Sequence, residues 1–117
     1  MNDRFKFRVY STINQKYIDE EKLKYFFVGA DGELYLQRKD GSILPISQEQ
    51  FVIETSTGLL DKNGKLIYEG DVIRVEDNNC SVSWDNENAR YEVSGYGEIA
   101  YLNYYDTEVI GDIHEKF

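Results

Sequence analysis

The sequence is poor in the residues from which most small functional sites are built. It has one cysteine, one histidine, one proline and one tryptophan in 117 residues. A single cysteine cannot close a disulfide within the chain, and structural zinc needs several cysteine or histidine ligands. We therefore expect neither a disulfide framework nor a structural zinc site, and we expect a cytoplasmic protein from a reducing compartment.

Long apolar runs are absent as well. The longest uninterrupted runs have four residues, as at 25–28, whereas a helix that spans a bilayer needs about 20 predominantly apolar residues. The first eight residues alternate charged with aromatic side chains and contain no apolar core of a signal peptide. The sequence therefore predicts no membrane span.

Positive charge is scarce in the second half of the chain. The net charge is -9, with ten basic and ten acidic residues up to Lys65, and three basic and twelve acidic residues from Leu66 onward. Nucleic-acid binding relies on lysine and arginine to neutralise phosphates, so the second half is a poor candidate for that role. Arg4, Lys6 and Arg8 alternate along an expected strand. They form either a small nucleic-acid-binding stripe or an ordinary polar strand face.

The hydrophobic pattern has a period of two through most of the chain, which predicts strands. Turn sequences separate short alternating segments, with hairpins expected over residues 24–38 and across Asn63-Gly64, where a type I′ turn fits both residues. Residues 72–93 predict a three-stranded meander, and residues 108–113 predict a closing strand.

These elements predict an all-β fold of short antiparallel strands in a small barrel or sandwich. We expect a single domain over residues 1–117, with N-terminal strands in 1–50 and a barrel-like core in 51–117. The alternative is an α+β fold with one short helix near residues 18–24.

A family resemblance appears in residues 57–73, TGLLDKNGKLIYEGDVI. This run resembles the signature of YopX-type proteins, which bacteriophages and prophages of Gram-positive bacteria carry. The flanks are similar too, at Lys6-Phe7-Arg8, at Val82-Ser83-Trp84 and in residues 108–113 near the end of the sequence. The resemblance covers nearly the whole chain and implies a β-rich phage accessory protein in a bacterial cytoplasm, with no established activity and no accepted catalytic residues.

The turns of this signature have a physical reading of their own. Asn63 and Gly64 form a hairpin turn, Gly70 relaxes the turn that follows, and Asp71 can accept hydrogen bonds from backbone N–H groups. The segment from Gly70 to Trp84 also looks like the opening of an SH3-like barrel.

No set of residues in the sequence forms a recognisable catalytic site. His114 stands three residues from the end of the sequence, and Cys80 has no basic neighbour in sequence that would lower its pKa. Carboxylates around Asp71, Asp85 and Glu87 leave a carboxylate-dependent hydrolase as an alternative. An Asx-rich turn accounts for Asp85 and Glu87. We therefore expect a protein that is not an enzyme and needs no metal or cofactor.

Aromatic residues among acids are the feature of the second half that folding alone explains least. Tyrosines give large rigid contact areas, and scattered acids steer a basic partner. Stacking of single-stranded bases is an alternative, as is the filling of half-exposed strand faces. The candidate protein-contact residues are Trp84, Tyr96, Tyr101, Tyr104 and Tyr105.

The leading functional hypothesis is a non-enzymatic module that binds a host or phage protein. One version of it is an acidic surface that mimics DNA and occupies a basic nucleic-acid-binding protein. A nucleic-acid-binding module that uses Arg4, Lys6 and Arg8 is the second class, and the carboxylate-dependent hydrolase is the third. Self-association through an exposed strand edge is also expected to be possible.

Overall fold

The structure is a computed structural model that describes residues 6–102 and 107–115, with Tyr101 described by its backbone alone. Strands dominate it and confirm the predicted all-β class. The chain divides into two compact units. One is Phe7–Glu54, called the N-terminal unit here, and the other combines Met1–Lys6 with Thr55–Phe117 and is called the C-terminal unit.

The N-terminal unit consists of short strands and one helical turn. Its elements are β1 (Phe7–Ser11), β2 (Lys16–Tyr17), α1 (Glu20–Leu23), β3 (Phe26–Val28), β4 (Leu34–Gln37) and β5 (Ile43–Pro45).

The helix α1 lies where the α+β alternative expected one. Asp19 caps it, because its Oδ1 accepts a hydrogen bond from the backbone N–H of Lys22 at 3.0 Å. With four residues, the helix is too short to change the strand-dominated class.

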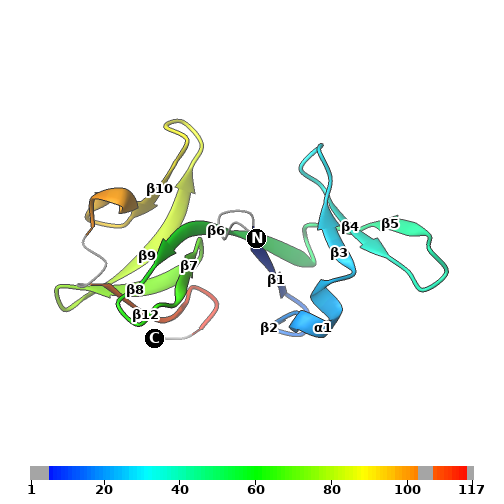
Figure 1. Ribbon diagram of the computed structural model, residues 1–117, viewed down its shortest axis with the longest axis horizontal. Coiled ribbons are helices and arrows are strands. Elements are labelled where there is room, and N and C mark those ends of the chain that lie inside the picture. Colours follow the sequence, from blue (N-terminus) through cyan, green and yellow to red (C-terminus); the bar gives the residue numbers. More distant parts are fainter. Residues whose placement is uncertain (1–5, 103–106, 116–117) are drawn as a thin grey trace. The chain divides into compact units, whose positions relative to one another are not determined.

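Strands β3, β4 and β5 form an antiparallel sheet in sequence order (Figure 1). The predicted hairpin over residues 24–38 is confirmed by the pairing of Val28 with Leu34 and of Phe26 with Leu36. Its turn is closed by Asp31, whose Oδ1 accepts from the N–H of Glu33 at 3.0 Å.

Strand β6 (Phe51–Leu60) is the longest strand and runs through the junction of the two units. The C-terminal unit continues with these elements: β7 (Leu66–Tyr68), β8 (Asp71–Val75), β9 (Asn78–Asp85), β10 (Arg90–Val93), β11 (Gly97–Glu98), the 3₁₀ turn η2 (Ile99–Tyr101) and β12 (Thr107–Asp112).

Five of these strands form a curled sheet in the order β11-β10-β9-β8-β12 (Figure 1). The first half of β9 pairs with β8 and its second half with β10, so that the predicted meander is confirmed. The predicted closing strand is confirmed as β12, which pairs antiparallel with β8.

One face of this sheet carries the core of the C-terminal unit. Alternate residues of the strands point to the same side, and the buried ones gather into a single cluster that includes Cys80. The cysteine is 4% exposed and fills space as a small apolar residue would. The cluster consists of Ile67, Ile73, Val75, Cys80, Val82, Val93 and Ile99.

The turn types differ from the prediction at one hairpin. Of Asn63 and Gly64, Gly64 alone has a positive φ, at 79°, so the expected type I′ turn is wrong there. The pair with positive φ at both positions is Glu76 and Asp77, at 49° and 71°, which joins β8 to β9 as a two-residue hairpin loop. The Asn63 turn is shaped instead by Asp61, whose Oδ1 accepts the N–H groups of Asn63 and Lys65.

No helix within the described residues combines the length and the apolar character that crossing a membrane requires.

Candidate functional site

Trp84 is a large aromatic residue that the fold leaves partly in solvent. It lies two residues after Val82 on β9 and therefore points to the same face of the sheet. Val82 is 2% exposed and belongs to the core, whereas Trp84 is 43% exposed. Trp84 thus extends the apolar face of β9 beyond the point where the core ends.

The indole of Trp84 is held on two sides. Its Nε1 donates a hydrogen bond to Oδ1 of Asn86 at 2.7 Å. Its ring packs edge to face against Tyr91, the cross-strand partner on β10, with ring centroids 4.8 Å apart and an interplanar angle of 64°. A partly exposed tryptophan with a hydrogen-bonded N–H and a packed neighbour has little freedom left to lose on binding.

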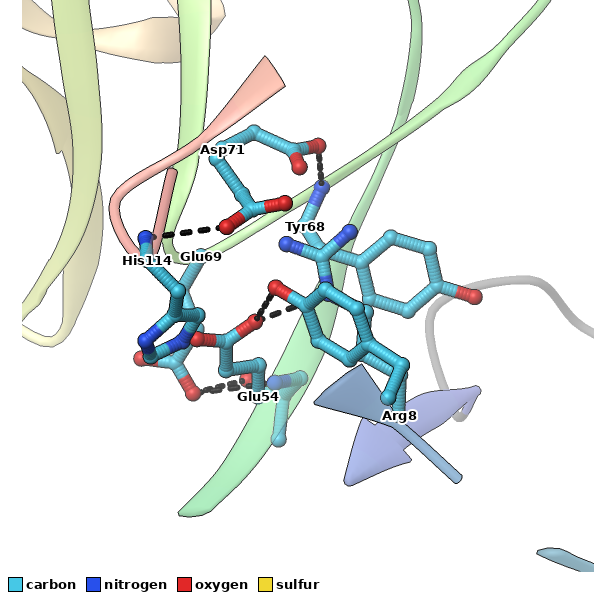
Figure 2. Close-up of polar contacts among 9 residues, drawn as sticks. Arg8, Glu54, Tyr68, Glu69, Asp71 and His114 are labelled. Atoms are coloured by element: carbon cyan, nitrogen blue, oxygen red, sulfur yellow. Dashed lines mark hydrogen bonds and ion pairs between the residues drawn. The ribbon is translucent and has the colours of Figure 1, made fainter. Parts of the chain in front are cut away.

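Tyr91 is itself fixed through a chain of polar groups within the C-terminal unit. Thr55 donates its hydroxyl proton to Oε1 of Glu69 at 3.1 Å, and its backbone N–H donates to the same oxygen at 2.9 Å. Tyr91 lies 2.6 Å from Thr55 Oγ1, and it must be the donor because the threonine proton is already used. Figure 2 shows Glu69 with these contacts to the backbone and side chain of its partner.

Acidic residues follow Trp84 along the chain, from the end of β9 to β11. Residues 84–98 contain four acids and one base, a net charge of -3. The base is Arg90, which pairs with Glu92 at 2.8 Å and lies 4.0 Å from Glu98. Strand alternation and register place Asp85, Glu92 and Glu98 on the face of the sheet opposite to Trp84 and Tyr91, so these acids act on a partner through their field and not as neighbours of the indole. We call Trp84, Tyr91 and the acids of residues 84–98 the Trp84 surface. Its acids are Asp85, Glu87, Glu92 and Glu98.

Hydrogen bonds within its turn favour the charged form of Asp85. The side-chain amide of Asn88 donates to Oδ2 at 2.7 Å, and the N–H of Glu87 donates to Oδ1 at 3.0 Å. These bonds, the one from Asn88 foremost, lower the pKa of Asp85 below its ordinary value. Asp85, which follows Trp84 in sequence, therefore carries its negative charge at pH 7.

The other predicted contact residues fall into two groups. Tyr96 packs against the core cluster, donates its hydroxyl to the carbonyl of Val75 at 3.3 Å and accepts from Nδ2 of Asn78 at 3.0 Å. Asn78 and Trp84 lie near opposite ends of β9, roughly 20 Å apart at the rise of a strand, so Tyr96 is not part of the Trp84 surface. Tyr101 lies in η2 with an undescribed side chain, and Tyr104 and Tyr105 lie outside the described residues.

The motif residues Gly70 and Asp71 form part of the frame of the C-terminal unit. Gly70 has a φ of +86°, and its N–H and C=O are both used, by Val82 and Ile113 at 2.8 Å each. Asp71 is 1% exposed and accepts the N–H of Tyr68 at 2.8 Å (Figure 2), as the sequence predicted.

The acids and the histidine singled out in sequence serve turns and strand ends. The backbone N–H of His114 donates to Oδ1 of Asp112 at 2.9 Å (Figure 2). Asp71 lies at the first residue of β8, and Asp85 and Glu87 lie around the β9–β10 turn. Within residues 6–102 and 107–115, the His, Cys, Asp and Glu side chains form no group of three or more that could hold a metal ion.

Arg8 of the N-terminal basic stripe belongs to a polar network inside the N-terminal unit. Its Nε donates to Oε1 of Glu54 at 2.8 Å, and its guanidinium lies 4.5 Å from the ring centroid of Tyr17. Tyr17 donates its hydroxyl to the same oxygen of Glu54 at 2.7 Å (Figure 2). Lys6 is exposed and belongs to the C-terminal unit, and Arg4 lies outside the described residues.

Trp84 is among the contact residues predicted from the sequence, whereas the residues that hold it are not. Tyr91 was one tyrosine among many, and the roles of Asn86 and Thr55 depend on strand register. The signal that was available is the spacing of Trp84 from Tyr91 across the polar residues 85–90, which is typical of a hairpin with a cross-strand aromatic pair.

Comparison with protein-family models gives a match over nearly the whole chain. Residues 6–116 match the protein-family model described as YopX protein, which covers both units. A search of curated proteins finds no match.

Proposed function

Since the chain belongs to the YopX family, whose name states no activity, we propose a function from the geometry: a non-enzymatic module that binds another protein through the Trp84 surface. The family resemblance further suggests a phage or prophage accessory protein that works in the bacterial cytoplasm, with a host or phage protein as its partner.

The observation that carries this proposal is the state of Trp84. The residue is 43% exposed, yet its ring orientation is set by Asn86 and Tyr91. Tryptophan and tyrosine are enriched among the few residues that supply most of the free energy of a protein interface. A side chain that is already ordered loses less conformational entropy when it is buried by a partner.

The net negative charge of the segment that carries Trp84, residues 84–98, suggests a basic partner for this segment. Its acids outnumber the single base, and that base is already paired with Glu92. Charge of one sign around an aromatic anchor speeds association with a surface of opposite charge and disfavours partners of the same charge. A nucleic-acid-binding protein of host or phage offers such a surface, and in that case the acids would take the place of phosphates.

The test is affinity capture from a lysate of a phage-bearing host, with nuclease present, by the tagged protein and two variants. Trp84→Ala removes the proposed anchor. Tyr25→Ala removes an aromatic side chain of similar exposure, 46%, from the N-terminal unit. We expect a partner that is retained by the wild type and by Tyr25→Ala and is lost, at least tenfold, with Trp84→Ala. Equal capture by all three proteins would contradict the proposal.

The purified pair then tests the charge argument. We expect the affinity to fall steeply between low and moderate salt, because exposed charges are screened over about 10 Å at 0.1 M salt. An affinity that does not change with salt would contradict the basic partner and the DNA-mimic version, while the dependence on Trp84 would still stand.

A further inference from the structure

The C-terminal unit contains an apolar cavity that the Trp84 surface does not include. Its volume is about 520 Å³, within the range of pockets that hold a small ligand or a large side chain. Its apolar lining comes from the end of β6, from β7 and from the region of η2. These residues are Leu59, Leu60, Ile67, Ile99, Ala100 and Leu102.

The wall at the end of β6 is held in place by Asp61. The carboxylate of Asp61 is 1% exposed and accepts three backbone N–H bonds, from Asn63 and Lys65 within the turn and from Val109 on β12. The N–H of Lys62 also donates to the carbonyl of Thr107 at 3.0 Å. The turn is therefore tied to β12 independently of anything that fills the cavity.

Two leucines at this wall are unusually exposed for their size. Leu59 is 40% exposed and Leu60 is 44% exposed, and both line the cavity. A large apolar side chain left in water forgoes the free energy that its full burial would supply. An apolar group that enters the cavity recovers part of this free energy.

The charged groups around the cavity are already engaged. Lys62 Nζ lies 2.8 Å from Oε2 of Glu108, and the Asp61 carboxylate is used by the backbone. An occupant therefore gains by burying apolar surface rather than by forming an ion pair with the lining.

The net charge of the C-terminal unit favours a positively charged molecule as the occupant of the cavity. The C-terminal unit contains seven basic and fourteen acidic residues, a net charge of -7. A field of this sign repels an anionic amphiphile such as a fatty acid and attracts an apolar group carried on a basic chain.

We propose that the cavity receives one bulky apolar side chain, aromatic or aliphatic, from a lysine- or arginine-rich segment of a partner protein. This inference rests on the proposed function and extends it. Trp84 is an aromatic group that the chain presents, whereas the cavity is a site that accepts such a group.

The test uses short peptides and nitrogen-15 NMR spectra of the full chain. The probe is the acetylated, amidated peptide Lys-Gly-Trp-Gly-Lys. One comparison peptide has alanine in place of the tryptophan, and another has glutamate in place of both lysines. We expect saturable shifts of the amide signals of Leu60, Gly64 and Ala100 with the probe, none with the alanine peptide, and at least fivefold weaker binding of the glutamate peptide.

Two variants show where the probe binds. Ala100→Phe fills the cavity from an exposed position of η2, and we expect it to weaken probe binding at least fivefold. Ala30→Phe makes the same change at an exposed position of the N-terminal unit and is expected to leave binding unchanged.

Each contrary result overturns the inference in a recognisable way. The absence of shifts at Leu60, Gly64 and Ala100 with millimolar probe, or equal shifts in Ala100→Phe, would exclude the cavity as the site. Shifts confined to Ser83 and Asn86 would place the peptide at the Trp84 surface and leave the proposed function standing. Equal binding of the glutamate peptide would overturn the basic partner segment.

Discussion

Asp61 shows how one buried carboxylate can hold several elements together. Its three backbone bonds join the β6–β7 turn to β12. An asparagine in its place has one acceptor oxygen and an NH₂ group, which cannot accept. We expect Asp61→Asn to lower the free energy of unfolding by about 1–3 kcal/mol, the cost of leaving a buried donor unsatisfied, as measured by urea denaturation at pH 7.

The matched control for this change is Glu49→Gln, which removes one carboxylate from an exposed position. It should shift the free energy of unfolding by less than about 0.5 kcal/mol. Equal destabilisation by the two variants would mean that net charge, rather than the three hydrogen bonds, sets the effect.

The same carboxylate gives a pH dependence with a definite sign. Burial alone would raise the pKa of Asp61, but the N–H groups of Val109, Lys65 and Asn63 together lower it below its ordinary value. A depressed folded-state pKa stabilises the fold above the unfolded-state pKa, and this stabilisation is lost as the pH falls through the folded-state pKa. We expect wild type and Asp61→Asn to converge in stability on acidification below about pH 4. A constant difference down to pH 2 would contradict the ionised state.

Glu54 has a comparable role in the N-terminal unit. It is 3% exposed and accepts from both Arg8 and Tyr17. Tyr17→Phe removes one donor to this charged group and is expected to lower the free energy of unfolding by about 1.5–3 kcal/mol. Tyr25→Phe, at an exposed tyrosine, serves as the control and should have no measurable effect in the same urea titration.

At the scale of elements, the β8–β9 turn is built from residues that fit it poorly. Glu76 and Asp77 both have positive φ, a region that Asn and Gly occupy at lower cost. The double change Glu76→Asn and Asp77→Gly should raise the free energy of unfolding by about 0.5–1 kcal/mol. The thermal unfolding midpoint provides the measurement.

A change in the Asn63 turn is the control, and its expected effect on the thermal unfolding midpoint has the opposite sign. Asn63 does not have a positive φ, so Asn63→Gly adds freedom to the unfolded chain without relieving strain. We expect it to lower the midpoint. A rise in both variants would show that backbone conformation is not what limits these turns.

The strands of the C-terminal meander were predictable because their signals are local. Alternation and turn residues define β8, β9, β10 and β12, and the Gly29–Gly32 turn defines the hairpin of β3 and β4. The turn type at Asn63 was not predictable in the same way. The Asp61 carboxylate competes for the backbone N–H groups of that turn, and Val109, which completes its hydrogen bonds, is distant in sequence.

The candidate site was predictable only in part, for a related reason. A lone tryptophan among acids suggests an interface, but its orientation depends on Tyr91 across the hairpin and on Thr55, which belongs to another strand. The cavity depends on Leu60 and Ala100, which are 40 residues apart in the sequence. Sequence periodicity describes which side of a strand is apolar and carries no information about such distant pairs.

At the scale of the whole molecule, β6 belongs to both units. Its residues up to Glu54 lie in the N-terminal unit and those from Thr55 in the C-terminal unit. We expect one cooperative unfolding transition, because the loss of either half frees the ends of a shared strand. Trp84 fluorescence reports on the C-terminal unit and far-UV circular dichroism on both, so their urea midpoints should coincide.

The variant Tyr17→Phe tests whether the two units unfold together. The change lies in the N-terminal unit, and coupling through β6 should lower the midpoint seen by Trp84 fluorescence as well as that seen by circular dichroism. A fluorescence midpoint that stays at the wild-type value would show that the two units unfold independently.

The placement of Lys6 also determines the order in which the protein can fold during synthesis. Lys6 accepts a hydrogen bond from the N–H of Ser56 at 2.9 Å, so Phe7–Glu54 is inserted between two parts of the C-terminal unit. On the ribosome, the whole N-terminal unit is made before any of the strands β7 to β12 exists. The first segment of the C-terminal unit, Met1–Lys6, is therefore synthesised long before the strands that complete that unit. Nascent chains generally fold their earlier units first, so we expect the N-terminal unit to fold before the C-terminal unit. The rate of translation over residues 55–112 therefore sets the time for which the N-terminal unit exists before the strands of the C-terminal unit have been synthesised.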